Sequence, residues 1–327
     1  MTTNSVRKVS IAATNRTTRE LGKLFNRLGS EQHPRGRILI SYRNAARALR
    51  DILRRQTGTL ALFEAQEVLD GLRRDVRDVA SKTLQAAVTL GQQQATTEYE
   101  AWGLEGGLGA SGNVDMFLDG WLGVVDQQAR ESLAIILAGG DSALILGDET
   151  RQGLLRPDTV ISNGARWLTS ATVLTFSDWL SGPIQQTGEV WGKQAIPVID
   201  LRTTNCCLEV AGQVVEFDKP FKLTGVPRFA DEMEWSPFHW YCRTSIAMVP
   251  MRLAEDELTQ RILSDAQTEL AERQIAREQA LETLQRIVEL GAKPDGRHRI
   301  DDSDEVSELR TEYVRLKRRG GNVEGGG

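Results

Sequence analysis

A long apolar seam between residues 59 and 98 constrains the fold of this chain more than any other feature of its sequence. Its members are Leu62, Ala65, Leu69, Leu72, Val76, Val79, Thr83, Ala86 and Leu90. They follow one another at steps of three and four, which is the spacing of one face of an α-helix. The seam therefore predicts a long helix that packs against another helix, in its own chain or in a partner.

Shorter helical patterns follow this seam. They predict helices over Val124–Leu137 and Pro157–Leu180, because proline stands at the start of the second pattern and glycine after the end of each. Between residues 102 and 123 glycines crowd together, and Gly107–Gly112 matches the form G-x-G-x-x-G. A dinucleotide site needs a strand before this motif, and here a long helix precedes it. We therefore expect a loop between helical layers.

Charge is unevenly distributed along the chain. The net charge is −5, but residues 1–57 hold thirteen basic residues against three acidic ones, which leaves −15 for the remainder. Residues 1–36 are polar and basic without a sustained period, which predicts an arm that orders only on a partner. The two ends of the molecule are expected to meet different neighbours.

An amphipathic helix is predicted from Ile38 to Arg55. One face carries Tyr42, Ala45, Leu49 and Ile52, and another carries Arg43, Arg47, Arg50 and Arg54. The arginine stripe is either a solvated helix face or a surface that meets phosphates or an acidic protein. No nucleic-acid-binding motif accompanies the stripe, so the sequence does not indicate a dedicated nucleic-acid-binding protein.

The C-terminal third is again helical in pattern. A mostly exposed helix lying along a partner is expected from Ala254 to Leu290, where three acidic residues each stand four positions before an arginine: Glu257/Arg261, Glu269/Arg273 and Glu282/Arg286. After a loop at Pro294–Arg299, a last helix begins near Asp301. Its short seam of Val306, Leu309, Tyr313 and Leu316 predicts a helical partner. The tail from Gly320 to Gly327 is predicted to be disordered.

All three cysteines and one of the three histidines fall between Trp191 and Met251. Alternating branched residues there predict strands over Gln194–Leu201, Gln213–Phe217 and Ser245–Met251. A small antiparallel sheet is therefore expected, with the cysteines and His239 near the strand ends.

Three hypotheses explain this cluster of thiols. Cys206, Cys207, His239 and Cys242 offer up to four nitrogen and sulfur ligands for a structural zinc ion, although adjacent side chains in an extended chain point opposite ways. A cysteine could instead act as a nucleophile with His239 as its base, although no local signature of thiol hydrolases is present. In the third hypothesis the cysteines are buried as small apolar residues. Asp200 and Arg202 then form an ion pair or hydrogen-bond the residues of a turn.

The same block resembles the signature of the phage head morphogenesis domain of Mu F-type minor head proteins. The resemblance covers residues 155–250 and is carried by Asp200-x-Arg202-Thr203, Cys207, Gly212-Gln213-Val214 and Pro237-x-His239-x-x-Cys242-Arg243. Thr204 and Thr244 stand where that family has cysteines, and Trp240 where it has proline. Two of the family's four cysteines are thus missing together. This favours a packing role for the remaining thiols, or a single Cys207–Cys242 pair, over a zinc site.

The resemblance implies a virion component: a minor capsid protein present in few copies, associated with the portal protein and the inner capsid. It would act in head assembly or DNA delivery, without enzymatic activity and without a required cofactor. Packaged DNA is a further expected partner, through the basic N-terminal segment. The sequence shows neither a secretory leader nor an apolar run of about 20 residues, so we expect assembly in the bacterial cytoplasm without membrane insertion.

The predicted fold class is α+β. A largely helical N-terminal region with long helices precedes a small antiparallel β domain in the middle and a helical C-terminal extension. The expected boundaries are residues 1–57, 58–150, 151–252 and 253–327. Two other functions stay open: a thiol-dependent hydrolase that uses Cys207 and His239, and a protein that contacts DNA through its basic N-terminal segment.

Overall fold

A computed structural model describes residues 2–26, 33–55, 59–104, 114–137, 155–240, 242–290 and 304–320. It confirms the α+β class, with long helices before and after a small antiparallel β region. The chain forms two compact units, one of residues 1–189 with 235–245 and one of residues 190–234 with 246–327. The predicted loops at Gly107–Gly112 and Pro294–Arg299 lie outside the described residues, as does the tail from residue 321 onward.

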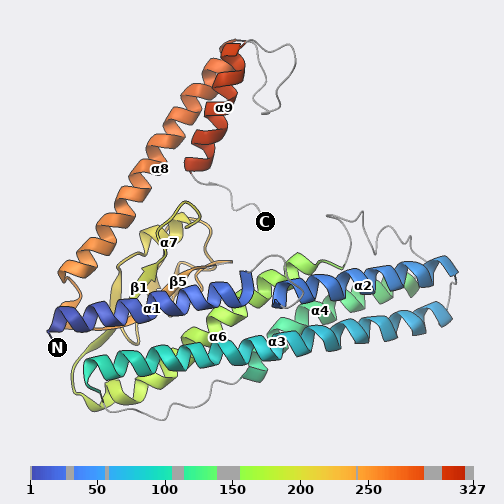
Figure 1. Ribbon diagram of the computed structural model, residues 1–327, viewed down its shortest axis with the longest axis horizontal. Helices are drawn as coiled ribbons and strands as arrows, with labels where there is room; N and C mark the ends of the chain where they lie inside the picture. Colours follow the sequence, from blue (N-terminus) through green and yellow to red (C-terminus); the bar gives the residue numbers. More distant parts are fainter. Residues whose placement is uncertain are drawn as a thin grey trace. The chain divides into compact units, whose positions relative to one another are not determined.

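The described residues of the first unit form the helix that carries the long seam and four helices that pack on it. These helices are α1 (Thr3–Asn26), α2 (Pro34–Arg55), α3 (Thr59–Trp102), α4 (Val114–Leu137) and α6 (Pro157–Gln186). Helix α3 is the predicted long helix, and it contacts the other four (Figure 1). The partner that the seam predicts is therefore in the same unit of the same chain.

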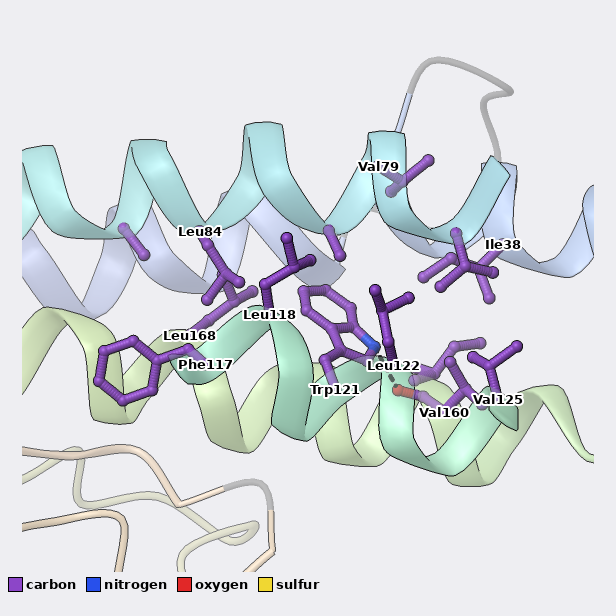
Figure 2. Close-up of a cluster of buried hydrophobic side chains, with 14 of the residues drawn as sticks. Ile38, Val79, Leu84, Phe117, Leu118, Trp121, Leu122, Val125, Val160 and Leu168 are labelled. Carbon is purple, nitrogen blue, oxygen red and sulfur yellow. Dashed lines mark hydrogen bonds between the residues drawn. The ribbon is translucent and has the colours of Figure 1, made fainter. Parts of the chain in front are cut away.

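The core of this unit lies where α4 enters between α3 and α6. Figure 2 shows the apolar side chains of α4 pointing into this space, among them Phe117, Leu118, Trp121 and Leu122. The Trp121 indole is fully buried, and its Nε1 donates a hydrogen bond of 3.0 Å to the carbonyl of Val160 at the start of α6. A buried indole needs such an acceptor, so this bond fixes the position of α4 along α6.

Helices α4 and α6 approach each other through a reciprocal pair of glycines and tryptophans. The ring of Trp167 on α6 covers Gly120 on α4, and the ring of Trp121 on α4 covers Gly164 on α6. At either glycine a Cβ atom would overlap the facing indole. Only glycine therefore permits this packing, since it alone lacks that atom.

The prediction of an N-terminal arm without structure of its own is wrong. Residues Thr3–Asn26 form α1, which packs on α3 through hydroxyl groups and a buried carboxylate. Ser10 Oγ donates to Glu98 Oε2 at 2.7 Å, and Thr14 Oγ1 donates to Glu98 Oε1 at 3.1 Å. Apolar periodicity did not reveal this helix because most of its buried face is polar.

Two helix boundaries also differ from those predicted. Helix α4 begins at Val114, ten residues before the predicted start at Val124. Helix α6 continues to Gln186 and includes Pro183, whereas the predicted helix ends at Leu180. Proline inside a helix removes one backbone hydrogen bond but does not force the helix to end. The predicted end at Leu180 came too early because Pro183 was interpreted as a helix terminator.

In the second unit the strands lie close to their predicted places. Strands β1 (Trp191–Pro197), β2 (Val214–Glu216) and β5 (Thr244–Pro250) form a sheet in the order β2–β1–β5, and β1 and β2 are antiparallel. A two-stranded ribbon joins β3 (Phe221–Lys222) to β4 (Glu232–Met233). Between β1 and β2 the chain forms the short helix α7 (Asn205–Glu209), and the 3-10 helix η1 (Met251–Leu253) follows β5.

Helices α8 (Glu257–Glu289) and α9 (Asp304–Arg319) form a hairpin in which α9 lies along α8 (Figure 1). The predicted partner of the α9 seam is thus α8 of the same chain, and Leu316 and Tyr313 pack against Ala276 and Ala280. The buried positions of α8 include a strict seven-residue series: Thr259, Ala266, Arg273, Ala280 and Ile287. Most other positions of α8 are exposed, which confirms the prediction of a mostly exposed helix with few buried residues.

None of the helices described by the structure has an apolar stretch long enough to cross a lipid bilayer.

Candidate functional site

The turn after β1 carries the first motif residues. The Asp200 carboxylate accepts a hydrogen bond of 2.8 Å from the backbone nitrogen of Arg202, and the nitrogen of Thr203 donates to the carbonyl of Asp200 at 2.9 Å. Thr203 Oγ1 in turn accepts from the nitrogen of Asp200. Of the two arrangements predicted for Asp200, the hydrogen-bonded turn is therefore observed. The side chain of Arg202 is exposed.

Arg273 of α8 stabilises this turn through hydrogen bonds to its backbone carbonyls. Its guanidinium group, 2% exposed, donates to the carbonyl of Thr203 at 2.5 Å and to the carbonyl of Asp200 at 2.9 Å. Its Nε donates to Glu269 at 2.8 Å. Two backbone carbonyls and one carboxylate thus satisfy a buried cation, which would otherwise be strongly unfavourable. The sequence placed Glu269 and Arg273 together but did not assign them to the turn.

Glu269 also joins the turn to α9. Arg319 donates to Glu269 at 2.8 Å and to Glu272 as well. Burial alone would raise the pKa of Glu269, but the hydrogen bonds from Arg319 and Arg273 outweigh it and hold the pKa below its usual range. Glu269 therefore stays ionised at neutral pH and links the turn, α8 and α9. Arg286, which was predicted to pair with Glu282, contacts Glu305 of α9 at 2.9 Å.

Helix α7 explains the burial of the adjacent cysteines. Thr204 caps it, since its hydroxyl accepts from the nitrogen of Cys207 at 3.4 Å. Cys206 and Cys207 are both buried in this helix, whereas the sequence analysis placed them in an extended segment. The threonine that stands in place of a cysteine of the resembling family is therefore a helix cap.

Gly212 ends the segment between α7 and β2 with a φ of +74°. A Cβ atom at this position would lie 3.2 Å from the carbonyl of Thr259 and 3.3 Å from the nitrogen of Leu263, both on α8. The left-handed conformation and the close helix backbone each favour glycine. This motif position therefore fixes the approach of the chain to α8.

The second part of the motif follows a cis peptide bond between Ser236 and Pro237. His239 Nδ1 lies 2.6 Å from the carbonyl of Trp240, and the nitrogen of Cys242 donates to the carbonyl of His239 at 3.2 Å. Burial alone would lower the pKa of His239, but the hydrogen bond with Cys242 and the Trp240 carbonyl raise it above the usual value. Arg243, the next motif residue, is half-buried.

An arginine from α6 stacks beside this loop. The guanidinium carbon of Arg166 lies 5.3 Å from the ring centre of Trp167 and 5.4 Å from that of Trp240. Contacts of this kind between a cation and an aromatic face are stabilising, by about 0.5 to 1 kcal/mol at partly exposed sites. Trp240, which replaces the proline of the resembling family, thus has a specific contact in the first unit.

The four candidate metal ligands are divided between the two units. His239 and Cys242 belong to the first unit, and Cys206 and Cys207 belong to the second. All four residues are buried. Thiols and imidazoles suit zinc, which prefers sulfur and nitrogen ligands. All three cysteines are free thiols, and the predicted Cys207–Cys242 pair is not formed.

Comparison of the chain with protein-family models, with curated proteins and with solved structures finds no match.

The predicted arginine stripe lies on the solvent side of α2. Arg43, Arg47 and Arg54 are exposed and Arg50 is half-buried, while Tyr42, Ala45, Leu49 and Ile52 are buried on the opposite face. Arg54 lies 4.0 Å from Asp51. Within the part of the chain that the structure describes, no ion pair or hydrogen bond engages the guanidinium groups of Arg43, Arg47 and Arg50. Their charges are available to a partner.

Proposed function

We propose that this chain is a bacteriophage minor head protein that associates with the portal protein and the inner capsid during head assembly. The observation that carries the proposal is the motif of residues 200–243, because its members occur in the order and spacing typical of the head morphogenesis domain. The roles of Asp200 and Gly212 support it: one closes a turn and the other admits a helix, as expected of residues that define a fold.

The environment of the thiols favours a structural protein over a thiol hydrolase. Cys206, Cys207 and Cys242 are 0%, 2% and 7% exposed, and a nucleophile must reach its substrate. The hydrolase alternative predicts that an electrophilic thiol reagent labels Cys207 selectively in the folded protein, and that His239→Gln abolishes this labelling. Equal, slow labelling of all three thiols would support the structural role.

The arginine stripe supports a contact with packaged DNA as a second role. Duplex DNA binding should weaken about tenfold in the variant Arg43→Gln with Arg47→Gln, because each lost phosphate contact also removes counterion release. The matched control is Arg74→Gln with Arg77→Gln, which removes two exposed charges from α3. Equal binding by both double variants would exclude the stripe as the DNA surface.

Zinc at the cluster of ligands predicted from the sequence, Cys207, His239 and Cys242, is a separate proposal. The test is metal analysis of protein purified without added metal, with Cys242→Ser as the ligand variant and Cys206→Ser as the control. About one zinc per chain that disappears only with Cys242→Ser would support a structural metal site. Absence of metal from every sample would leave the cluster with a packing role.

The decisive experiment for head assembly is mass spectrometry of purified particles together with pull-down of the portal protein from the same genome. We expect the chain to be present at low copy number and to co-purify with the portal. Absence from the particle, or presence at the abundance of the major capsid protein, would contradict the proposal.

A further inference from the structure

A groove of about 550 Å³ opens between the turn after β1 and helix α9. Leu201, at the tip of the turn that Arg273 holds, forms one side. Helix α9 forms the other side with Arg310, Val314, Arg315, Arg318 and Arg319. The groove thus brings guanidinium groups and aliphatic side chains together in the second unit.

The positive charge of this groove is only partly neutralised. Arg319 is held by Glu269 and Glu272, and Arg315 lies 3.2 Å from Glu312. Arg318 is exposed and has no ion pair within the described residues. The side chain of Arg315 is 74% exposed, so its surface pair with Glu312 is weak and readily exchanged for another carboxylate. The groove can therefore accept a negatively charged ligand.

Apolar surface beside these charges distinguishes between classes of anion. Leu201 is 56% exposed although hydrogen bonds hold its turn, and Val314 is half-buried. A phosphate backbone would use the guanidinium groups and leave this aliphatic surface in water. A peptide with carboxylates and an aliphatic side chain would use both. The lining therefore favours an acidic peptide over a nucleic acid.

The groove is preformed. Glu269 receives hydrogen bonds from Arg273, which holds the turn of Leu201, and from Arg319, which belongs to α9. One network of hydrogen bonds thus fixes both walls. Little conformational freedom is lost on binding to a site that is already ordered, which favours affinity.

We propose that this groove binds a carboxylate-rich peptide segment of a partner protein. Carboxylates of the segment contact Arg315 and Arg318, and an aliphatic side chain packs on Leu201 and Val314. The groove and its chemistry do not depend on head assembly. If the proposed function is correct, the segment belongs to a capsid or portal partner, and a failure of particle association would leave the peptide site intact.

The test uses the full-length chain and a fluorescent peptide of alternating glutamate and leucine, followed by anisotropy at about 0.1 M salt, where surface charges still act over about 10 Å. We expect the double variant Arg315→Glu with Arg318→Glu to weaken binding at least about tenfold, since two attractive contacts become repulsive. The control Lys317→Glu reverses one charge on α9 outside the groove lining, half the charge change of the double variant, and should alter affinity less than about twofold.

A second variant tests the aliphatic half of the site. Leu201→Ser lies outside α9. It should weaken binding of the glutamate–leucine peptide about three- to tenfold, because one apolar contact is lost. Binding of a glutamate–serine peptide should not change. Circular dichroism establishes that each variant is folded, and the Leu201 variant keeps the test decisive if an α9 variant unfolds.

Two results would overturn the proposal. One is equal peptide affinity in the wild-type chain and in both groove variants. The other is binding of duplex DNA through Arg315 and Arg318 more tightly than the peptide, which would make the groove a phosphate site.

Discussion

Helices α1 and α2 both pack on α3, yet they do so by different physical means. The buried face of α2 is apolar and aromatic: Ile38, Tyr42, Ala45, Leu49 and Ile52. The buried face of α1 is mostly polar: Val6, Arg7, Ser10, Ala13, Thr14 and Thr17. At its centre the fully buried carboxylate of Glu98 accepts hydrogen bonds from Ser10, Thr14 and Gln94.

The packing of α1 on α3 and the packing of α2 on α3 are expected to respond differently to substitutions. Apolar packing is non-directional, so each side chain of α2 contributes roughly in proportion to the surface that it buries. A buried polar network is favourable only while every member has its partners, because an unsatisfied buried group has a desolvation penalty of about 1 to 3 kcal/mol. We therefore expect graded losses when α2 is altered and abrupt loss of α1 when its network is broken.

The largest effect is expected from Glu98→Ala. It removes the carboxylate that accepts hydrogen bonds from Ser10, Thr14 and Gln94 and opens a cavity, and breaking such a buried network costs about 4 kcal/mol. Native-state hydrogen exchange should show this loss in the amides of α1, with α2 little changed. The quadruple variant Ser10→Ala, Thr14→Val, Gln94→Leu and Glu98→Leu serves as control. It should regain most of the loss, because all the partners become apolar together. Equal losses in α1 and α2 would contradict the distinction.

Leu49→Ala should give the next largest effect. Leu49 is fully buried between α2 and α3, and the substitution removes about 3 kcal/mol from the free energy of opening of α2. Hydrogen exchange of the α2 amides measures the loss. The exposed Leu60, at 59%, supplies the matched control, since Leu60→Ala should change this free energy by less than about 0.5 kcal/mol.

Tyr42→Phe tests a polar contact in the apolar face of α2. The Tyr42 hydroxyl donates to Gln128 Oε1 at 3.1 Å, and its loss should lower stability by about 1 kcal/mol. Burial raises the pKa of Tyr42 above its usual value of 10.0. The folded chain therefore holds this proton more tightly than the unfolded chain, and stability falls as the pH rises above about 10. In Tyr42→Phe this part of the decline should disappear. An unchanged slope would show that Tyr42 does not cause it.

The smallest effect is expected from Arg37→Ala. Arg37 lies 2.9 Å from Asp78 of α3, but both side chains are more than 40% exposed. Water and salt screen such a surface pair, so hydrogen exchange of α2 should not change measurably. A loss as large as that of Leu49→Ala would mean that surface charge, and not apolar burial, attaches α2.

The comparison of α1 with α2 also shows what could be predicted from the sequence. Helices α2 and α3 were predictable because apolar residues recur on their buried faces. Helix α1 was not, since serine and threonine lie where a periodic search looks for apolar residues. Its signal would have been a helical series of small hydroxyl residues, Ser10, Thr14 and Thr17, combined with a glutamate inside a buried seam.

The candidate site was predicted in part. The turn at Asp200 could be inferred because turn chemistry is local, whereas the close approach of Gly212 to α8 is a long-range contact that the sequence did not show. Helix α7 was missed because five residues are too few to show a period. The link from Arg273 to the turn spans 70 residues, and only its place in the series Thr259, Ala266, Arg273 marked it as buried.

The reciprocal glycines and tryptophans of α4 and α6 have a mechanical consequence. Packed helices commonly accommodate conformational change by sliding along each other. Sliding of α4 against α6 would drive the Trp121 and Trp167 rings into helix backbone beside Gly164 and Gly120. This pair of helices therefore moves as one rigid body. A displacement at one end of the pair is transmitted to the other end and is not absorbed by sliding between the helices.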